Sequence, residues 1–421
     1  MGSSVPQASD TEAVPRELSL RWVAVSVFIA SSTLNFLDRQ LLNTLAPLIL
    51  TEFHLSQTGF GFIVSIFSFA YAASSLGVGW LLDKLGVNRA MSLAVAWWSL
   101  AATATAFIRS FGGLAVCRAC LGVGESAGVP AVGKVNGVYL KPEERALGAA
   151  LNQVGISLGL AAAPLFIGLA IHYSWRAPFT LVGMLGFVWI PVWLFVNRRI
   201  RPSFETFSPD EAESSRPDLG MLLDKSLLAL VLSNILWMGG YSLWSNWTTL
   251  YLVHVHGITL VESARYVWIP PLVSNFGGFF GGWLSKRSME RGVPPVAARR
   301  KAVWWSAGGY LLTLLLPFAP SAGTATALIS VSFFFALAGS VNIYAIPIDL
   351  FGAARSGLGI GALVFAYGFL QTLISPVIGY LSDHGLYTQV VWLVVVPAVL
   401  GAAALQPVRE ANAVRNEGRV R

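Results

Sequence analysis

Long apolar runs follow one another along almost the whole chain, and short polar segments separate them. A helix needs about 20 mostly apolar residues to cross the hydrocarbon core of a bilayer. Because no water is available there to bond the backbone, runs of this length cross as helices. The sequence therefore predicts an all-α membrane protein with twelve spans, at residues 22–50, 58–83, 88–108, 112–138, 146–171, 177–197, 227–253, 262–286, 299–319, 323–348, 356–382 and 386–405.

The composition agrees with a chain that lies mostly in lipid. It is 55% hydrophobic and only 12% charged, whereas soluble domains carry about 25% charged residues. The net charge of +7 raises the alternative of nucleic-acid binding. The basic residues lie in short loops between apolar runs, so we expect a lipid bilayer and no nucleic acid as the partner. Residues 1–20 are polar and lack the apolar core of a signal peptide, so they are predicted to be a disordered cytoplasmic tail.

The distribution of lysine and arginine predicts the orientation. With the N-terminus inside, Arg109, Arg176 and Arg265 are the only ones of the 28 Lys and Arg residues that fall in outside loops. Inside loops of membrane proteins carry the excess of positive charge. We therefore expect both termini in the cytoplasm of an integral membrane protein, with a bacterial inner membrane as the expected location.

A central polar stretch divides the runs six and six, and the halves resemble each other. Gly79-Trp80-Leu81 follows the second run and Gly282-Trp283-Leu284 follows the eighth. A duplicated six-helix unit of this kind characterises one large transporter architecture. The predicted organisation is a tail at 1–20, an N-terminal six-helix bundle at 21–197, a cytoplasmic linker at 198–225, a C-terminal bundle at 226–406 and a tail at 407–421.

Four charged residues lie inside apolar runs of the first half: Asp38, Arg39, Arg118 and Glu125. A charge within a bilayer costs several kcal/mol unless it faces a partner or water, so such residues are functional candidates. Arg118 and Glu125 are two helical turns apart, which places them on one face about 10 Å from each other. Asp38 and Arg39 point about 100° apart. The alternative is a permanent buried ion pair that fixes helix packing.

Polar and aromatic residues in other runs are candidates for binding a solute. Tyr241 lies at helical spacing from Asn234, Trp237 and Trp244, so this face is interpreted either as the wall of a binding site or as helix packing. Amide side chains also join helices to each other in membranes. The candidates for substrate binding, besides Arg39 and Arg118, are Tyr71, Asn152, Gln153, Tyr241, Asn275, Asn342, Tyr367 and Gln371.

The residues of an enzyme or a metal centre are not found. The two cysteines, Cys117 and Cys120, lie in one apolar run, and their spacing is not that of a metal site. No nucleophile elbow or phosphate-binding loop occurs in a suitable context. We expect no enzymatic activity, no cofactor and no metal.

The loop after the second run resembles the signature of the major facilitator superfamily. In GWLLDKLGVNR, the residues Gly79, Asp83, Lys84, Gly86 and Arg89 satisfy its pattern. The resemblance implies twelve transmembrane helices in two pseudo-symmetric six-helix bundles, the major facilitator fold, and a monomer. It also implies a gating role for Asp83, Lys84 and Arg89. Lys134, near the predicted cytoplasmic end of its run, is assigned to the interface or to gating.

A closer resemblance is to the anion:cation symporter branch of that superfamily. NFLDRQLLNTLAP contains Asp38 and Arg39, and RACLGVGESAGVPAVGK contains Arg118 and Glu125. The resemblance implies that Asp38 and Glu125 carry coupling protons. It implies that the two arginines attract an anion or pair with the carboxylates.

The prediction is a secondary active transporter that imports a small organic anion, a sugar acid or other carboxylate, together with protons by alternating access. A neutral-sugar facilitator and a proton-antiport drug exporter remain as alternatives within the transporters. A membrane nutrient sensor that binds its ligand without moving it is the alternative from another class.

Overall fold

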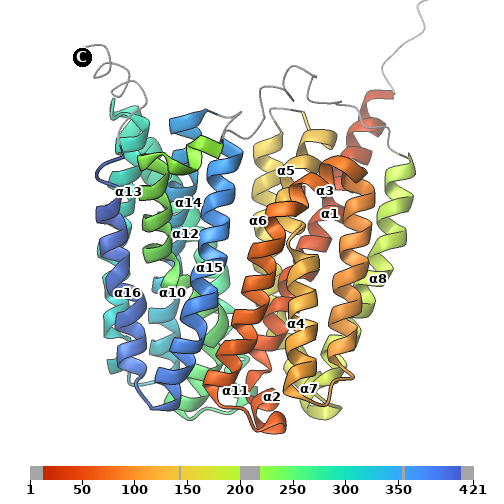
Figure 1. Ribbon diagram of the computed structural model, residues 1–421, viewed down its shortest axis with the longest axis vertical. Coiled ribbons are helices and arrows are strands. Elements are labelled where there is room, and N and C mark those ends of the chain that lie inside the picture. The colour runs from red at the N-terminus through yellow and green to blue at the C-terminus, as the bar shows by residue number, and fades with distance from the viewer. Residues whose placement is uncertain (1–12, 142–143, 200–218, 353–355, 409–421) are drawn as a thin grey trace, which may run out of the picture.

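The computed structural model describes residues 13–141, 144–199, 219–352 and 356–408, and these are almost entirely helical (Figure 1). Most of both predicted tails and most of the predicted linker lie outside the described residues. Residues 13–20, which were predicted to belong to a disordered tail, instead form the start of α1. The first half contains α1 (Ala13–Thr44), α2 (Ala46–Phe53), α3 (Gln57–Thr105), α4 (Phe111–Glu125), α5 (Gly128–Tyr139), α6 (Arg145–Ala162), η1 (Ala163–Phe166), α7 (Ile167–His172) and α8 (Arg176–Arg199).

The second half repeats this arrangement of long helices. Its elements are η2 (Leu219–Leu223), α10 (Lys225–His256), α11 (Leu260–Ser263), α12 (Ile269–Glu290), α13 (Pro295–Tyr310), η3 (Leu311–Phe318), α14 (Ala322–Phe351), α15 (Ser356–Asp383) and α16 (Tyr387–Ala404).

The predicted spans correspond to these helices. Eight helical stretches of the described chain are long and apolar enough to cross a membrane. Helix also occupies the other four predicted ranges, 88–108, 112–138, 262–286 and 299–319. The prediction of an all-α membrane protein with two six-helix bundles is therefore confirmed.

One predicted boundary agrees with the structure and another differs. The predicted spans 58–83 and 88–108 lie within a single continuous element, α3, but the helix is broken at Gly86, which lies between the two spans. Gly86 has φ 72° and ψ 152°, a backbone conformation that only glycine adopts without strain. The fourth span divides after Glu125 into α4 and α5. The hydropathy pattern did not indicate this second break, because the residues around Glu125 are mostly small or apolar.

Side chains at the helix starts explain where several helices begin. The N-cap residues Ser56 and Ser110 accept hydrogen bonds from Gly59 N and Gly113 N. Asp224 accepts from two backbone N–H groups at the start of α10. These bonds satisfy donors that have no partner within the helix.

The repeated motif occupies equivalent positions in the two halves. Lys84 lies 4.8 Å from the ring of Trp80 on α3, and Arg287 lies 5.3 Å from the ring of Trp283 on α12. At the same spacing, Lys286 stands where the first half has Asp83, and the hydroxyl of the neighbouring Ser285 donates to the carbonyls of its own helix. The motif therefore keeps its aromatic and basic pair in both halves and its acidic residue only in the first.

The halves share a core at one end of the molecule only. We call the end that carries the two chain termini the terminal end and the opposite end the distal end (Figure 1). One apolar cluster joins residues of both halves and includes Leu41, Phe60, Trp247 and Ile378. The two other clusters each lie within a single half. The halves are therefore packed together at the distal end.

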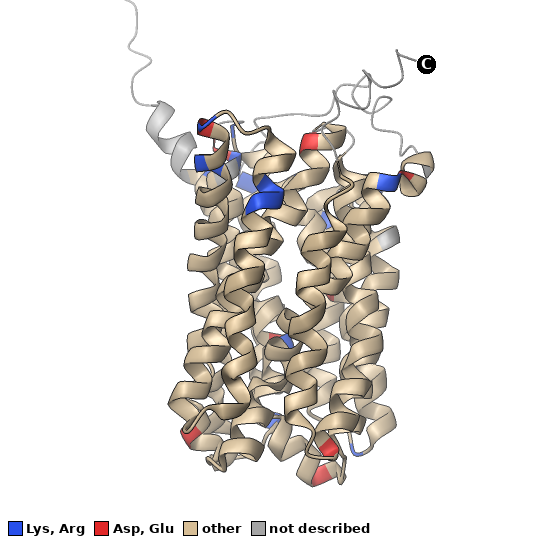
Figure 2. Cartoon of the chain, turned by 90° about the vertical axis from the view of Figure 1, so that its left-hand side faces the viewer, with Lys and Arg blue, Asp and Glu red and all other residues tan. Residues whose placement is uncertain are grey.

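Most contacts between the halves join α3 to α15, α6 to α12 and α1 to α10. Smaller contacts join α2 to α10 and α7 to α11. Phe60 and Trp247 meet edge to face across this boundary with ring centroids 5.4 Å apart. Figure 2 shows lysine and arginine gathered at the terminal end and a few charged residues in the middle of the molecule.

Candidate functional site

A buried ion pair joins α1 to α4 in the first half. Arg39 donates to Glu125 Oε2 through Nη2 at 2.9 Å and Nε at 3.2 Å. The side chain of Glu125 is fully buried and that of Arg39 is 24% exposed. The sequence predicted both residues as candidates but did not predict that they pair. The other oxygen, Glu125 Oε1, has no hydrogen-bond partner among the described residues.

Two glycines bring α4 against α3 and place Glu125. A Cβ on Gly122 would lie 2.5 Å from Phe67 O, and one on Gly124 would lie 2.8 Å from Trp97 Cδ1. No side chain fits in these gaps, so the two helices can approach this closely only with glycine there. Glu125 is the last residue of α4, directly before the break that leads into α5.

Three aromatic rings surround the guanidinium of Arg39. Its Cζ lies 4.7 Å from the ring centroid of Phe36, 4.8 Å from that of Phe67 and 4.9 Å from that of Tyr71. Cations over aromatic faces are attracted by the ring quadrupole. The sequence analysis named Tyr71 but missed both phenylalanines. Helical spacing could have indicated them, because Phe36 precedes Arg39 by three residues and Phe67 precedes Tyr71 by four.

Asp38 and Arg118 lie close to this pair and are less completely bonded. Asp38 is within electrostatic range of Glu125 and Arg118. It is 1% exposed, and neither of its carboxylate oxygens has a hydrogen-bond partner among the described residues. Arg118 lies over the ring of Phe179 at 5.4 Å, and its Nε has no hydrogen-bond partner in the described chain. The arrangement brings two acids and two bases together in one half.

The second half turns a group of tyrosines toward Arg39. Tyr241 on α10 and Tyr367 on α15 are both within electrostatic range of Arg39, and their ring centroids are 6.1 Å apart. Tyr344 on α14 interacts with Tyr71 and Tyr241. Tyr71, Tyr241 and Tyr367 were predicted candidates, and the structure brings them together. Tyr344 was not predicted, although it lies two residues after the predicted candidate Asn342.

Other predicted binding residues lie apart from this cluster. Asn152 accepts a hydrogen bond from Ser32, which joins α6 to α1 within the first half. Gln153, the next residue, is exposed. Asn275 accepts from Ser157 Oγ at 2.8 Å, and this bond crosses from α12 to α6 between the halves.

Several polar and aromatic groups of the second half are bonded within that half. Asn342 Nδ2 donates to Gly281 O on α12 at 3.0 Å. Trp237 donates to Ala336 O and Trp244 to Ser332 Oγ. For these two tryptophans the packing interpretation holds. Gln371 is half-buried on α15.

The predicted gating residues lie toward the terminal end. Lys84 contacts Trp80, Arg89 is exposed, and Lys134 is half-buried on α5. The side chain of Asp83 is outside the described residues. Asp349 forms an ion pair with Arg299 of α13 at the same end.

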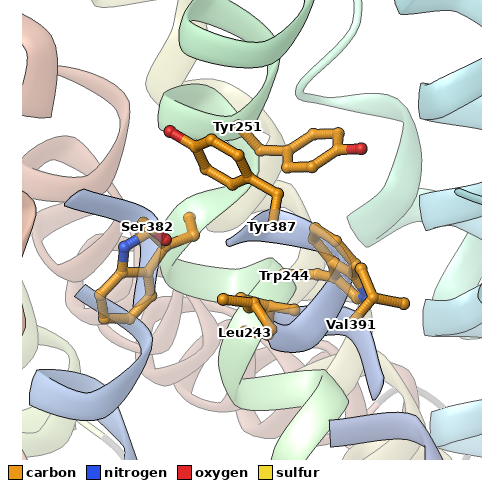
Figure 3. A pocket seen from close by; sticks show the side chains of 8 residues that line it. Leu243, Trp244, Tyr251, Ser382, Tyr387 and Val391 are labelled. Atoms are coloured by element: carbon orange, nitrogen blue, oxygen red, sulfur yellow. The ribbon is translucent and has the colours of Figure 1, made fainter. Parts of the chain in front are cut away.

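A pocket lies away from the charged cluster, within the distal part of the second half. Figure 3 shows it between Leu243, Trp244 and Tyr251 of α10, Ser382 of α15, and Tyr387 and Val391 of α16. It has room for about one water molecule. It is therefore too small to bind a sugar acid.

Two bundles of membrane-spanning helices with a charged cluster in one of them define a membrane transport protein. The family model described as Major Facilitator Superfamily matches residues 28–339. The chain belongs to this superfamily.

Two curated relatives and a solved structure show what the chain is similar to. It is 25% identical over 402 residues to the hexuronate transporter of Escherichia coli strain K12, covering 92% of this chain and 93% of the relative. It is 26% identical over 281 residues to the galacturonate transporter of Dickeya chrysanthemi, covering 63% of this chain and 81% of the relative. The crystal structure of a bacterial homologue of the human lysosomal transporter Spinster, in an inward-facing and occupied conformation, has a TM-score of 0.73 at 19% identity and covers 91% of this chain and 96% of that one. This last likeness supports the fold.

Proposed function

We propose that the protein is a secondary active transporter that imports a small organic anion, of the sugar-acid class, together with protons by alternating access. The relatives named for hexuronate and galacturonate support the substrate class. The single observation that carries the mechanism is the buried pair of Arg39 and Glu125. Arg39 can bind a substrate carboxylate in place of Glu125, and Glu125 can then bind a proton in place of Arg39.

Arg39 is the anchor for the substrate carboxylate. A guanidinium binds a carboxylate through two parallel hydrogen bonds, and Arg39 already binds Glu125 through two of its nitrogens. The rings of Phe36, Phe67 and Tyr71 hold the guanidinium when its partner changes. The substrate therefore competes with Glu125 for the same cation.

Glu125 couples this exchange to a proton. A carboxylate that loses its arginine in a buried site favours its neutral form. When the substrate takes Arg39, Glu125 binds a proton, and when the substrate leaves, the proton leaves as the pair re-forms. Asp38 and Arg118 supply a second acid and base beside it, with Asp38 as the other coupling residue.

The second half binds the carbon skeleton. The phenols of Tyr241 and Tyr367, with Tyr71, offer donors and acceptors to the hydroxyls of a sugar acid near Arg39. Arg118, Asn152, Gln153, Asn275, Asn342 and Gln371 complete the proposed set of binding residues. Their positions rank them behind the tyrosines, since several are bonded elsewhere or exposed.

The lysine and arginine at the terminal end support a cytoplasmic location of that end, in a bacterial inner membrane. With this orientation, the packed distal end faces outward and the described conformation is inward-facing. Asp83, Lys84, Arg89 and Lys134 then lie on the cytoplasmic side, where we propose that they gate. We also propose a monomer whose bundles extend over 21–197 and 226–406.

Uptake into proteoliposomes tests the proposal. Radiolabelled hexuronates, other sugar acids, simple carboxylates and the matching neutral sugars are supplied with and without an inward proton gradient. Wild type is expected to accumulate a sugar acid only with the gradient. Glu125→Gln is expected to lose gradient-driven accumulation while it still exchanges internal for external substrate.

The alternatives give different results in the same assay. Accumulation of neutral sugars without a requirement for a carboxylate indicates a facilitator. Efflux driven by the gradient indicates a drug exporter. Ligand binding without movement in any condition indicates a sensor.

A further inference from the structure

The carboxylate of Asp383 binds the start of a helix in the other half. Asp383 is the last residue of α15, and α3 begins at Gln57. Its Oδ1 accepts from Gln57 N at 2.7 Å. Its Oδ2 accepts from Thr58 N at 2.9 Å and from Thr58 Oγ1 at 2.6 Å. Both carboxylate oxygens are therefore bonded across the boundary between the halves.

The backbones of α3 and α15 touch beside these bonds. A Cβ on Gly379 would lie 2.2 Å from Gln57 O, and one on Gly61 would lie 2.4 Å from Ser375 O. Tyr387 of α16 also accepts from Gln57 Nε2 at 3.1 Å. We call this close contact between α3 and α15 the seam. Because the helices are this close, Asp383 reaches the first turn of α3 only while the distal end is closed.

The donors that Asp383 binds need a partner from outside their helix. The first N–H groups of a helix have no acceptor within it. The N-cap residue Ser56 binds Gly59 N and leaves Gln57 N and Thr58 N to Asp383. When the halves separate at this end, these N–H groups and the carboxylate form hydrogen bonds with water instead. The direct hydrogen bonds between them therefore stabilise only the closed arrangement.

We propose that Asp383 is a gating residue: its carboxylate closes the distal end by capping α3 from the opposite half, and it releases α3 when that end opens to admit substrate. This inference rests on the proposed function in so far as it assumes alternating access. In this inference Asp383 alone shifts the equilibrium between the open and closed distal end toward the closed conformation. Hydrogen bonds to a charged group in a partly exposed place support a bias of about three- to tenfold.

A matched control lies at the same end of the molecule. Glu262 accepts from Thr259 N at 2.8 Å and from Thr259 Oγ1 at 2.9 Å, so it caps α11 within its own half. Glu262→Gln therefore removes the charge from a distal cap whose hydrogen bonds lie within its own half. Thr58→Val removes one of the three bonds to Asp383 and keeps the two backbone donors.

Distances between spin labels in nanodiscs test the proposal. The labels are placed on the exposed residues Arg109 and Gln389 for the distal end, and on Lys141 and Arg291 for the terminal end. The background carries Cys117→Ser and Cys120→Ser. Asp383→Ala is expected to raise the ratio of open to closed distal populations about three- to tenfold. The terminal pair is expected to shift toward shorter distances in the same variant.

The other variants decide the interpretation. Thr58→Val is expected to shift the distal distances in the same direction by less, and Glu262→Gln to leave them as in wild type. An Asp383→Ala protein with wild-type distances overturns the proposal, as does an equal shift in Glu262→Gln. If Asp383→Ala does not fold, Asp383→Asn and Thr58→Val carry the test. These distances need no substrate, so they stand even if the uptake assay rejects the sugar-acid function.

Discussion

The two halves have the same helical plan but different interiors. The first half buries Asp38, Arg118 and Glu125 and partly buries Arg39, and several polar atoms of the three buried residues have no hydrogen-bond partner among the described residues. The second half buries indoles and amides, such as those of Trp237 and Asn342, that donate to its own backbone. Among the described residues, the fully buried charged side chains therefore all lie in the first half.

The largest expected effect breaks the charged pair of the first half. Arg39→Gln leaves Glu125 buried without its cation, which costs about 3–5 kcal/mol of stability. Uptake is expected to fall by about 100-fold or more. The double variant Arg39→Gln/Glu125→Gln is expected to recover thermal stability without recovering uptake. Unchanged uptake with an unchanged KM in Arg39→Gln would contradict the assignment of Arg39.

The next prediction tests whether the halves move against each other at the seam. Gly61→Ala places a Cβ 2.4 Å from Ser375 O, so α3 and α15 must separate. Overpacking of this kind costs about 1–3 kcal/mol, and we expect uptake to fall about tenfold. Gly77→Ala on the same helix is the control, because nothing lies within 4 Å of its added Cβ. An equal loss of uptake in Gly61→Ala and Gly77→Ala would contradict a role of the α3–α15 contact in the movement of the halves.

A third prediction asks whether the second half binds solute through Tyr241. Tyr241→Phe keeps the ring contact with Phe333, at 5.3 Å between centroids, and removes the hydroxyl. Loss of one hydrogen bond of about 1 kcal/mol should raise the KM about fivefold, with the melting temperature unchanged. An unchanged KM would assign Tyr241 to packing.

A fourth prediction separates scaffold from site within the second half. Trp237→Phe leaves Ala336 O without its donor and should lower stability by about 1–2 kcal/mol. Thermal unfolding in detergent measures this loss. We expect the KM of the purified variant to stay within about twofold of wild type. A large change in KM with normal stability would indicate that Trp237 belongs to the binding site.

The smallest effect is expected at an exposed ion pair of the first half, in contrast to the pair of Arg39 and Glu125. Glu52, on α2, accepts from Trp175 and pairs with Arg176 Nη1 at 2.6 Å. Partial burial opposes its ionisation, but these bonds outweigh it and lower the pKa of Glu52. The stabilisation is therefore present above its ordinary pKa of about 4.3 and is lost as the pH falls through the lowered value.

Glu52→Gln measures that contribution. At pH 7 the variant should be less stable than wild type by under about 1 kcal/mol, because the pair is exposed to solvent. The difference in melting temperature should shrink as the pH is lowered below about 4. A difference that grows in acid would contradict the lowered pKa.

The fold was predictable because its signals are local and repeated. Run length and composition predicted the spans, and the Trp80 and Trp283 motifs predicted the duplication. The break between α4 and α5, after Glu125, was not predicted, because the residues around it are mostly small or apolar.

The site was predictable as a set of residues but not as a geometry. Charge inside an apolar run indicated Arg39 and Glu125, yet their pairing depends on how α4 packs against α1 and α3. Phe36 and Phe67 look like ordinary apolar residues until a cation lies between them. Asp383 follows the predicted span 356–382 directly, so it was placed in a loop. Its partners lie more than 300 positions away along the chain, so no local pattern indicated its hydrogen bonds.

The four buried charges of the first half have an electrical consequence. With all four ionised, the two carboxylates and two guanidinium groups sum to zero. A carrier without substrate would then reorient without moving net charge through the field, and the voltage would act only on loaded steps. A monovalent anion with one proton adds no charge, whereas a second proton adds one, worth about 2.3 kcal/mol per 100 mV. For a monovalent anion, the absence of a substrate-induced current therefore indicates one coupled proton, and an inward positive current indicates two.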